Sequence, residues 1–448
     1  MRLSKAIGRR AFPAALLVAL ASAPGAAVAG AGPLETLVAA SADYGVRNFY
    51  LRREHRPLWF RDGRVVPEAR RLVSILRAAE HDGLGVDADR LAAAERIAAD
   101  PRPLDPAALA RAELLLSEAW IAHVQALAAP ADDEMSYIDA SLAPSRPFPA
   151  AILAAAAAAP SLGEHLREAT AMNPLYQELH DELERRRAAG DVAMEAQLRR
   201  NLDRARALPR SARGKYVVVD VAAQRLYLFE DGRVRDTMKV VVGKASEPTP
   251  MAAGLIRSVV VNPYWNVPPD LVRRRIAPRV LAQGLGYLRE AGFEPLAGWE
   301  DDAAPVDAAA VDWAAVAAGR ATVRVRQLPG RGNAMGAMKF PFPNRWGVYL
   351  HDTPEKALFA DGDRAQSSGC VRLEDAPRLA RWLLGRDPAA AAGPEQAVPL
   401  PAPVPVYLTY LTAGREGQRL VLRRDIYGRD RPGVARAANT HGTESTRG

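Results

Sequence analysis

One cysteine occurs in the 448-residue chain, at Cys370 within residues 367–372, which read SSGCVR. A lone cysteine cannot close a disulfide within the chain, so its value lies either in packing or in reactivity. Small residues before Cys370 permit a sharp turn, and the positive charges of Arg364 and Arg372 favour a thiolate. A histidine upstream, His351, could act as its base. Cys370 is therefore a candidate nucleophile, and a buried structural cysteine is the alternative.

The first 29 residues predict a secretory signal peptide. Basic residues open the chain, residues 11–21 are apolar, and a small-x-small cleavage site precedes Gly30. This apolar run is shorter than the about twenty residues that a membrane-spanning helix needs, although an uncleaved anchor stays an alternative. We therefore expect a periplasmic protein. An unpaired thiol is unusual in an oxidising compartment, which favours a chemical role for Cys370.

Charge and composition argue against two other classes of function. The net charge is +8, and it falls to about +4 without the predicted signal peptide. Charges of both signs are interspersed, and basic residues cluster only in short runs such as 185–187 and 273–275. This pattern favours a solvated surface over a nucleic-acid-binding one. A single cysteine and the lack of an HExxH motif argue against a metal centre.

The remaining histidines lie in helix-like or tail segments with no partner recognisable in the sequence. Such histidines are more often surface or helix-capping residues than catalytic ones. They are His55, His81, His123, His165, His180 and His441.

Residues 30–212 predict an all-helical domain. Apolar residues recur at spacings of three and four in segments such as 70–76 and 109–129, with alanine between them. Residues 149–160 are nearly all alanine, which suits a closely packed helix. Asn173 and the proline after it restart a charged helical stretch.

Residues 213–430 predict a mostly β domain, so the chain as a whole is expected to be an α+β protein. Apolar residues alternate with period two, and tight turns separate the segments. A helix over 375–384 follows the cysteine. The strands are expected at 216–221, 225–229, 238–243, 254–261, 322–326, 346–350, 405–411 and 419–422.

Two further segments interrupt or follow this β domain. Residues 268–319 predict a helical insertion, and its position between the aromatic segment 264–265 and the strands leading to His351 suggests a lid over the site. The last residues, 431–448, lack an apolar pattern and predict a disordered tail.

At this point a family resemblance can be stated. The histidine segment 351–354 followed by residues 367–372 resembles the signature of YkuD-type L,D-transpeptidases. The agreement extends over about 215–430 and resembles the large periplasmic subgroup, whose scaffold domain residues 30–212 resemble more loosely. The segments that carry it are 241–244, 248–250, 262–269, 326–330, 333–336, 339–344 and 425–430.

The chain departs from that subgroup at two places. A small peptidoglycan-binding helical module is usual between scaffold and catalytic domain, and its pattern is not found between residues 145 and 213. Such a module is either absent here or has diverged. Ser368 stands where many relatives have histidine, which leaves His351 as the candidate base.

The resemblance implies a reaction and roles for particular residues. The Cys370 thiolate would attack the L-centre-to-D-Ala bond of a peptidoglycan tetrapeptide stem, release D-Ala and leave a thioester. His351 would be the base, oriented by the backbone carbonyl of Asp352. Backbone N–H groups around Gly369 and Cys370 would stabilise the oxyanion. The residues implied to bind substrate are Tyr349, Trp265, Ser368, Gly369 and Arg372.

No cofactor and no metal are implied. The expected partners are peptidoglycan stems and cell-wall synthesis proteins. Transfer to another stem would give a 3-3 crosslink, transfer to a lipoprotein would anchor that protein to the wall, and transfer to water would be carboxypeptidase activity. A wall-binding scaffold without catalysis is the remaining alternative.

Overall fold

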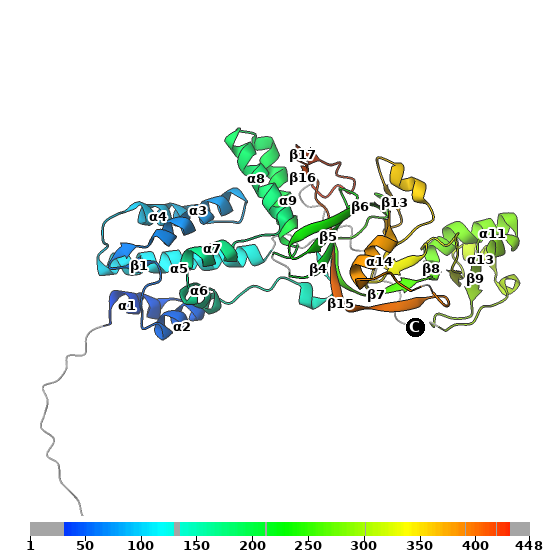
Figure 1. Cartoon of the computed structure of the whole chain (residues 1–448), viewed down its shortest axis with the longest axis horizontal. Helices are drawn as coiled ribbons and strands as arrows, with labels where there is room; N and C mark the ends of the chain where they lie inside the picture. Colours follow the sequence, from blue (N-terminus) through cyan, green and yellow to red (C-terminus); the bar gives the residue numbers. More distant parts are fainter. Residues whose placement is uncertain are drawn as a thin grey trace, which may run out of the picture.

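The computed structural model describes residues 31–129, 135–210, 213–300, 302–389, 391–417 and 419–430. The predicted signal peptide, residues 1–29, and the predicted disordered tail, residues 431–448, lie outside these ranges. The N-terminal helices gather at one end of an elongated molecule, the large sheet lies in the middle, and a further group of short helices and strands lies at the other end (Figure 1). Among the described helices, none is long and apolar enough to cross a membrane.

The N-terminal helices pack around α5, which supplies the buried Trp120. Asp105 starts this helix by accepting hydrogen bonds from the N–H groups of Ala107 and Ala108, which removes unpaired donors from its first turn. Trp59 from a neighbouring loop joins the same apolar cluster. The helices are α1 (Pro33–Ala40), α2 (Tyr44–Arg52), α3 (Pro67–His81), α4 (Ala88–Ala99), α5 (Pro106–Ala128), α6 (Pro149–Ala158) and α7 (Leu162–Ala169).

Two helices link this region to the strands. Asn173 caps α8 (Pro174–Ala188), and α9 (Val192–Arg206) returns beside it. Apolar residues of both helices pack in one cluster with Leu411 and Ala413, next to the hairpin β16 (Ala413–Glu416) and β17 (Arg419–Leu422). The pair α8–α9 is therefore joined to the C-terminal part of the chain, as Figure 1 also shows.

Residues 30–212 also contain strands that the helical prediction missed. β1 (Phe60–Arg61) and β2 (Arg64–Val65) form a hairpin, and β3 (Ser136–Tyr137) pairs in parallel with a strand of the large sheet. Each has two residues, too few to show an alternating pattern in a sequence.

Nine strands from the second half of the chain form a ten-stranded sheet together with β3. Its order is β11-β12-β14-β6-β5-β4-β15-β7-β3, with β13 paired to β6, and β11 also pairs with β7 so that the sheet closes on itself. The strands are β4 (Lys215–Asp220), β5 (Arg225–Glu230), β6 (Arg233–Gly243), β7 (Ala252–Val261), β11 (Met338–Phe340), β12 (Leu350–His351), β13 (Ala365–Ser367), β14 (Val371–Leu373) and β15 (Gln396–Thr409).

The helix predicted after the cysteine is α14 (Ala376–Leu384). Asp375 caps its N-terminus by accepting a hydrogen bond from the Arg378 N–H, and Gly385 ends it at φ 71°. Its apolar stripe packs into the core of the sheet. Local caps and a regular stripe made this element predictable.

One predicted strand, over 346–350, is largely a turn. The Asn344 side chain donates to the carbonyls of Phe342 and Val348 and accepts from the N–H groups of Trp346 and Val348. These bonds occupy backbone N–H and carbonyl groups that would otherwise be free to pair with a neighbouring strand. Only Leu350 and His351 join the sheet.

The insertion over 268–319 is not purely helical. It begins with α10 (Pro269–Leu271), a π-helical turn (Val272–Ile276) and α11 (Ala277–Gln283), followed by α12 (Gly286–Glu290), β9 (Phe293–Leu296), a 3-10 turn (Ala308–Ala310) and α13 (Trp313–Ala317). β9 completes a three-stranded sheet with β8 (Trp265–Val267) and β10 (Arg324–Gln327), in the order β8-β10-β9. A separate apolar cluster fills this unit.

Candidate active site

The cysteine and the histidine are brought together by two neighbouring strands. β12 and β14 pair in parallel, with Leu350 opposite Val371 and His351 opposite Arg372, and the Val371 N–H donates to the Tyr349 carbonyl at 2.9 Å. Leu350 and Val371 are fully buried in the core. Because side chains alternate between faces, the flanking residues point to the other face. That face carries Tyr349, His351, Cys370 and Arg372.

The His351 ring is held in one orientation. Its side chain is buried, and Nδ1 donates a hydrogen bond to the Asp352 carbonyl at 2.5 Å, which leaves Nε2 as the basic nitrogen. Burial, and to a lesser extent the charge of Arg372, lower the pKa of His351 to about 4. The imidazole is therefore neutral near neutral pH and can accept a proton.

Cys370 lies in a turn that other groups of the loop organise. Ser367 Oγ donates to the Cys370 carbonyl at 2.6 Å and accepts from the Gly369 N–H at 3.2 Å, and Gly369 has a φ of 106° that disfavours side chains. Burial raises the pKa of the Cys370 thiol, against the smaller lowering effects of the Tyr349 N–H and of Arg372. The resting pair is therefore a neutral thiol and a neutral imidazole.

The expectation that Arg364 and Arg372 together favour a thiolate is corrected by this arrangement. Arg372 does act in that direction, but burial outweighs it. Arg364 is buried elsewhere, where its guanidinium donates to the carbonyls of Val240, Asp361 and Gln224. Those backbone contacts give Arg364 a structural task.

Both oxygens of the Asp352 carboxylate have partners in the protein. Oδ2 accepts from the Ala337 N–H at 2.9 Å, and Oδ1 forms an ion pair with Lys356 at 2.6 Å. Gly336, at φ 60°, lies directly against this carboxylate, and a Cβ at that position would overlap it. The carboxylate thereby holds in place the residue whose carbonyl orients His351.

Four of the implied substrate-binding residues lie near Cys370, and the fifth, Trp265, does not. Tyr349 is half-buried beside Cys370, and Arg372 pairs with Glu355 at 2.5 Å. Ser368 is exposed next to Gly369, and its hydroxyl bonds Glu247. Trp265 lies instead in the sheet of the insertion, where its ring packs against Phe293 at 6.2 Å.

Sequence reasoning missed several residues that support this site. Thr249 is fully buried, and its hydroxyl donates to the Gly369 carbonyl at 2.8 Å. Glu247 contacts Ser368 on one side and Arg274 of the insertion, at 3.1 Å, on the other. A threonine between two prolines is a weak sequence signal, because nothing local shows which distant loop it contacts.

Three histidines expected at the surface or in caps have other environments. His180 Nδ1 pairs with Asp82 at 2.7 Å, and His81 Nδ1 pairs with Glu184 at 2.8 Å. His123 is buried, which lowers its pKa to about 4. Each pair joins the C-terminal end of α3 to α8, so both pairs are contacts between helices.

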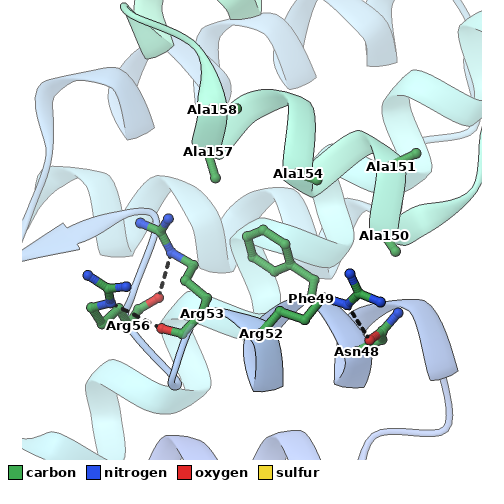
Figure 2. Close-up of a pocket in the computed structure, with 10 residues that line it drawn as sticks. All are labelled: Asn48, Phe49, Arg52, Arg53, Arg56, Ala150, Ala151, Ala154, Ala157 and Ala158. Atoms are coloured by element: carbon green, nitrogen blue, oxygen red, sulfur yellow. Dashed lines mark hydrogen bonds between the residues drawn. The ribbon is translucent and has the colours of Figure 1, made fainter.

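A separate groove of about 600 Å³ lies between α2 and α6 in the helical region (Figure 2). The arginines of its α2 wall bond local acceptors: Arg52 donates to Asn48, and Arg53 donates to the carbonyls of Arg56 and Pro57. The α6 wall is alanine. This lining offers positive charge but neither a nucleophile nor a base.

Comparisons with known proteins agree with the architecture. Residues 214–406 match the family model of the L,D-transpeptidase catalytic domain, YkuD, and residues 45–183 match the model of the scaffold domain. A suspected L,D-transpeptidase of Haemophilus influenzae is 34% identical over 239 residues, which are 52% of this chain and 47% of that protein. The chain thus spans about half the length of this curated relative.

Solved structures with similarity include an L,D-transpeptidase from Mycobacterium smegmatis, at 15% identity over 43% of this chain and 58% of that one, with a TM-score of 0.22. Another is the catalytic domain of the E. faecium L,D-transpeptidase acylated by ertapenem, at 17% identity over 44% and 98% of the two chains, with a TM-score of 0.22.

With the fold, the paired strands and the family matches in place, the class of protein follows. Residues 214–406 belong to the YkuD family of L,D-transpeptidase catalytic domains, and residues 45–183 to the scaffold-domain family.

Proposed function

We propose that this protein is a periplasmic peptidoglycan L,D-transpeptidase in which Cys370 is the nucleophile and His351 the base. The observation that carries the proposal is the placement of both side chains on one face of the β12–β14 pair, with His351 Nδ1 bonded to the Asp352 carbonyl. The donor is a tetrapeptide stem and the acceptor an amine of another stem, which gives a 3-3 crosslink.

The first half-reaction begins with a neutral pair. As Sγ attacks the carbonyl carbon of the L-centre-to-D-Ala bond, its proton passes to Nε2 of His351, and a tetrahedral oxyanion forms. When the oxyanion collapses, the C–N bond breaks and the imidazolium returns the proton to the departing D-Ala amine. A thioester remains on Cys370.

The second half-reaction reverses these roles. The acceptor amine attacks the thioester carbonyl, gives its proton to Nε2, and displaces the Cys370 thiolate, which recovers that proton. The Asp352 carbonyl keeps the ring in place through both transfers, since it accepts from Nδ1 in either protonation state.

Residues around the pair fit the recognition of an acidic peptide. Arg372 lies on the same face as Cys370, and its partner Glu355 is exposed, so a substrate carboxylate could exchange with that glutamate. Tyr349 offers a half-buried ring beside the thiol. We propose Arg372 and Tyr349 as contacts of the donor stem, with Ser368 and Gly369 lining its path.

Incubation of the purified protein with a disaccharide-tetrapeptide tests the proposal. A crosslinked product with the mass of two disaccharide-tetrapeptides minus one D-Ala supports transpeptidation. A hydrolysed monomer would overturn it in favour of carboxypeptidase activity, and no change, together with no adduct when a carbapenem such as ertapenem is added, would favour a non-catalytic wall-binding scaffold. Cys370→Ala and Cys370→Ser should both lose the product while keeping their melting temperature.

A further inference from the structure

A buried hydroxyl contacts the peptide unit that precedes the nucleophile. Thr249 has no exposed surface. Its Oγ1 donates to the Gly369 carbonyl at 2.8 Å and accepts from the Gly243 N–H at 2.9 Å. The hydroxyl therefore both donates and accepts a hydrogen bond, and its proton points to the Gly369 carbonyl.

The Gly369 carbonyl and the Cys370 N–H belong to the same peptide unit. Since that unit is planar and trans, the two groups point in opposite directions, and fixing the carbonyl fixes the N–H. Gly369 itself has a φ of 106°, where glycine has unusual freedom to rotate. An external bond to its carbonyl is therefore what holds this plane.

The two N–H groups of the loop differ in this structure. The Gly369 N–H donates to Ser367 Oγ at 3.2 Å. Among the hydrogen bonds of the described residues, none engages the Cys370 N–H. The Cys370 N–H is thus available to a developing oxyanion, whereas the Gly369 N–H is occupied.

We propose that Thr249 is a positioning residue that aims the Cys370 N–H at the oxyanion, and that Tyr427 locks Thr249 in place. This inference rests on the proposed acyl-transfer function. Oriented backbone donors matter because they act where charge develops in the transition state, and loss of one such donor costs about 100- to 1,000-fold in kcat.

Tyr427 holds Thr249 in place, although it lies in a segment far away in the sequence. Its hydroxyl donates to the Gly243 carbonyl at 2.6 Å and accepts from the Thr249 N–H at 3.2 Å. Its ring stacks on Tyr410 at 5.2 Å, with the Arg429 guanidinium 5.2 Å from each ring. This stacking fixes the position of the Tyr427 ring and therefore of its hydroxyl.

Close packing at Gly243 shows how little room this arrangement has. A Cβ there would meet backbone atoms of Pro248 at 2.9 Å and Thr249 at 2.7 Å, distances that real Cβ atoms do not show. The turn carrying Thr249 therefore lies directly on the end of β6. The C-terminal segment that carries Tyr427 also contacts α9, since Arg204 donates to the Arg429 carbonyl at 2.7 Å and to Asp430 at 2.8 Å.

The test compares Thr249→Val, which keeps the shape and loses the hydroxyl, with Thr249→Ser, which keeps the hydroxyl. Two reactions of Cys370 are followed in each variant: transfer from the tetrapeptide donor, which passes through an oxyanion, and alkylation by iodoacetamide, which does not. For Thr249→Val we expect kcat to fall about 10- to 100-fold, with KM and the alkylation rate within about twofold of wild type. Thr249→Ser should recover most of kcat.

Tyr427→Phe should lower kcat in the same way but less, because the Thr249 hydroxyl remains. Tyr137→Phe is its matched control, since Tyr137 also donates to a backbone carbonyl, that of Ala207 at 3.0 Å. It should leave kcat unchanged.

Proportional losses of transfer and alkylation in Thr249→Val would overturn the inference, because they would indicate general disruption of the loop. Unchanged kcat in a folded Thr249→Val protein would overturn it as well. If Thr249→Val does not fold, Tyr427→Phe decides alone by the same two assays. Failure of the proposed function is distinct, because wild-type protein would then lack transfer.

Discussion

At the residue scale, the site pairs two uncharged groups whose ionisation is opposed by burial. The pKa of Cys370 is raised, and that of His351 is lowered to about 4. A thiolate–imidazolium pair is therefore not the resting state. In the proposed reaction the thiol loses its proton as the substrate carbonyl is attacked, so the orientation of His351 matters more than a charge already present on the thiol.

The first prediction concerns the pH dependence of thiol reactivity. Since the pKa of Cys370 is raised, alkylation should increase through alkaline pH, above the range of a free cysteine at about 8.5. Arg372→Met should shift the inflection higher, because the Arg372 charge lowers the pKa of Cys370. Iodoacetamide rates from pH 6 to 11 measure the shift. Arg372→Lys, which keeps the charge, is the control, and identical profiles for Arg372→Met and wild type would contradict the assignment.

The second prediction concerns Gly336, at φ 60° against the Asp352 carboxylate. Gly336→Ala should displace that carboxylate, and with it the carbonyl that orients His351, lowering kcat about tenfold and stability by about 1–3 kcal/mol. Gly232→Ala is the matched control: it has a φ of 73° with no neighbour within 4 Å, so it carries backbone strain alone. Equal kcat in the two variants would argue against a role of Asp352 in positioning.

At the element scale, the insertion over 268–319 has its own apolar core and sheet, and it reaches the Cys370 loop through an ion pair. Arg274, in the π-helical turn, contacts Glu247 at 3.1 Å, and Glu247 bonds Ser368. This chain of contacts from Arg274 through Glu247 to Ser368 supports the lid hypothesis. A unit that only packs on the sheet would not need one.

The third prediction tests that hypothesis by replacing residues 271–318 with a short Gly/Ser linker. The excision preserves β8 and β10, whose antiparallel pairing places Val267 opposite Val325, so a hairpin can close the gap. If the insertion orients the donor stem, transfer should fall at least tenfold more than iodoacetamide alkylation of Cys370. Circular dichroism and melting must show a folded product. Equal losses in both assays, or none, would leave only a packing role.

At the scale of the whole molecule, the scaffold region and the strands are linked through α8 and α9. α8 contacts α3 through the pairs His180–Asp82 and His81–Glu184, while α9 contacts the C-terminal segment through Arg204. The same helix pair therefore bridges the N-terminal helices and the part of the chain that forms the large sheet (Figure 1).

The fourth prediction is a pH dependence of that bridge. Hydrogen bonding to Asp82 raises the pKa of His180. A raised folded-state pKa stabilises the fold below the unfolded value of about 6.5, and this stabilisation is lost as pH rises through the folded value. Urea unfolding of wild type should therefore lose up to about 1 kcal/mol between pH 6 and 8 that Asp82→Asn does not lose. The same slope in both proteins would contradict the assignment.

Much of the fold could be predicted because its signals are local. The switch from helical spacing to alternation near Lys215 separates the two regions, and Asp375 with an apolar stripe marks α14. The failures were also physical: Asn344 turns a strand-like segment into a loop, and strands of two to four residues such as β3 and β9 exist only through distant partners.

The sequence by itself marked Cys370 and His351 as candidates, because a lone cysteine, small neighbours and an upstream histidine are properties of residue type and spacing. Only the tertiary structure decided that both side chains share a face, since the parallel register of β12 and β14 is a long-range pairing. It also decided which arginine acts on the thiol, and it brought Thr249 and Tyr427 to the Gly369 loop. Such contacts join segments far apart in the chain, so no local pattern encodes them.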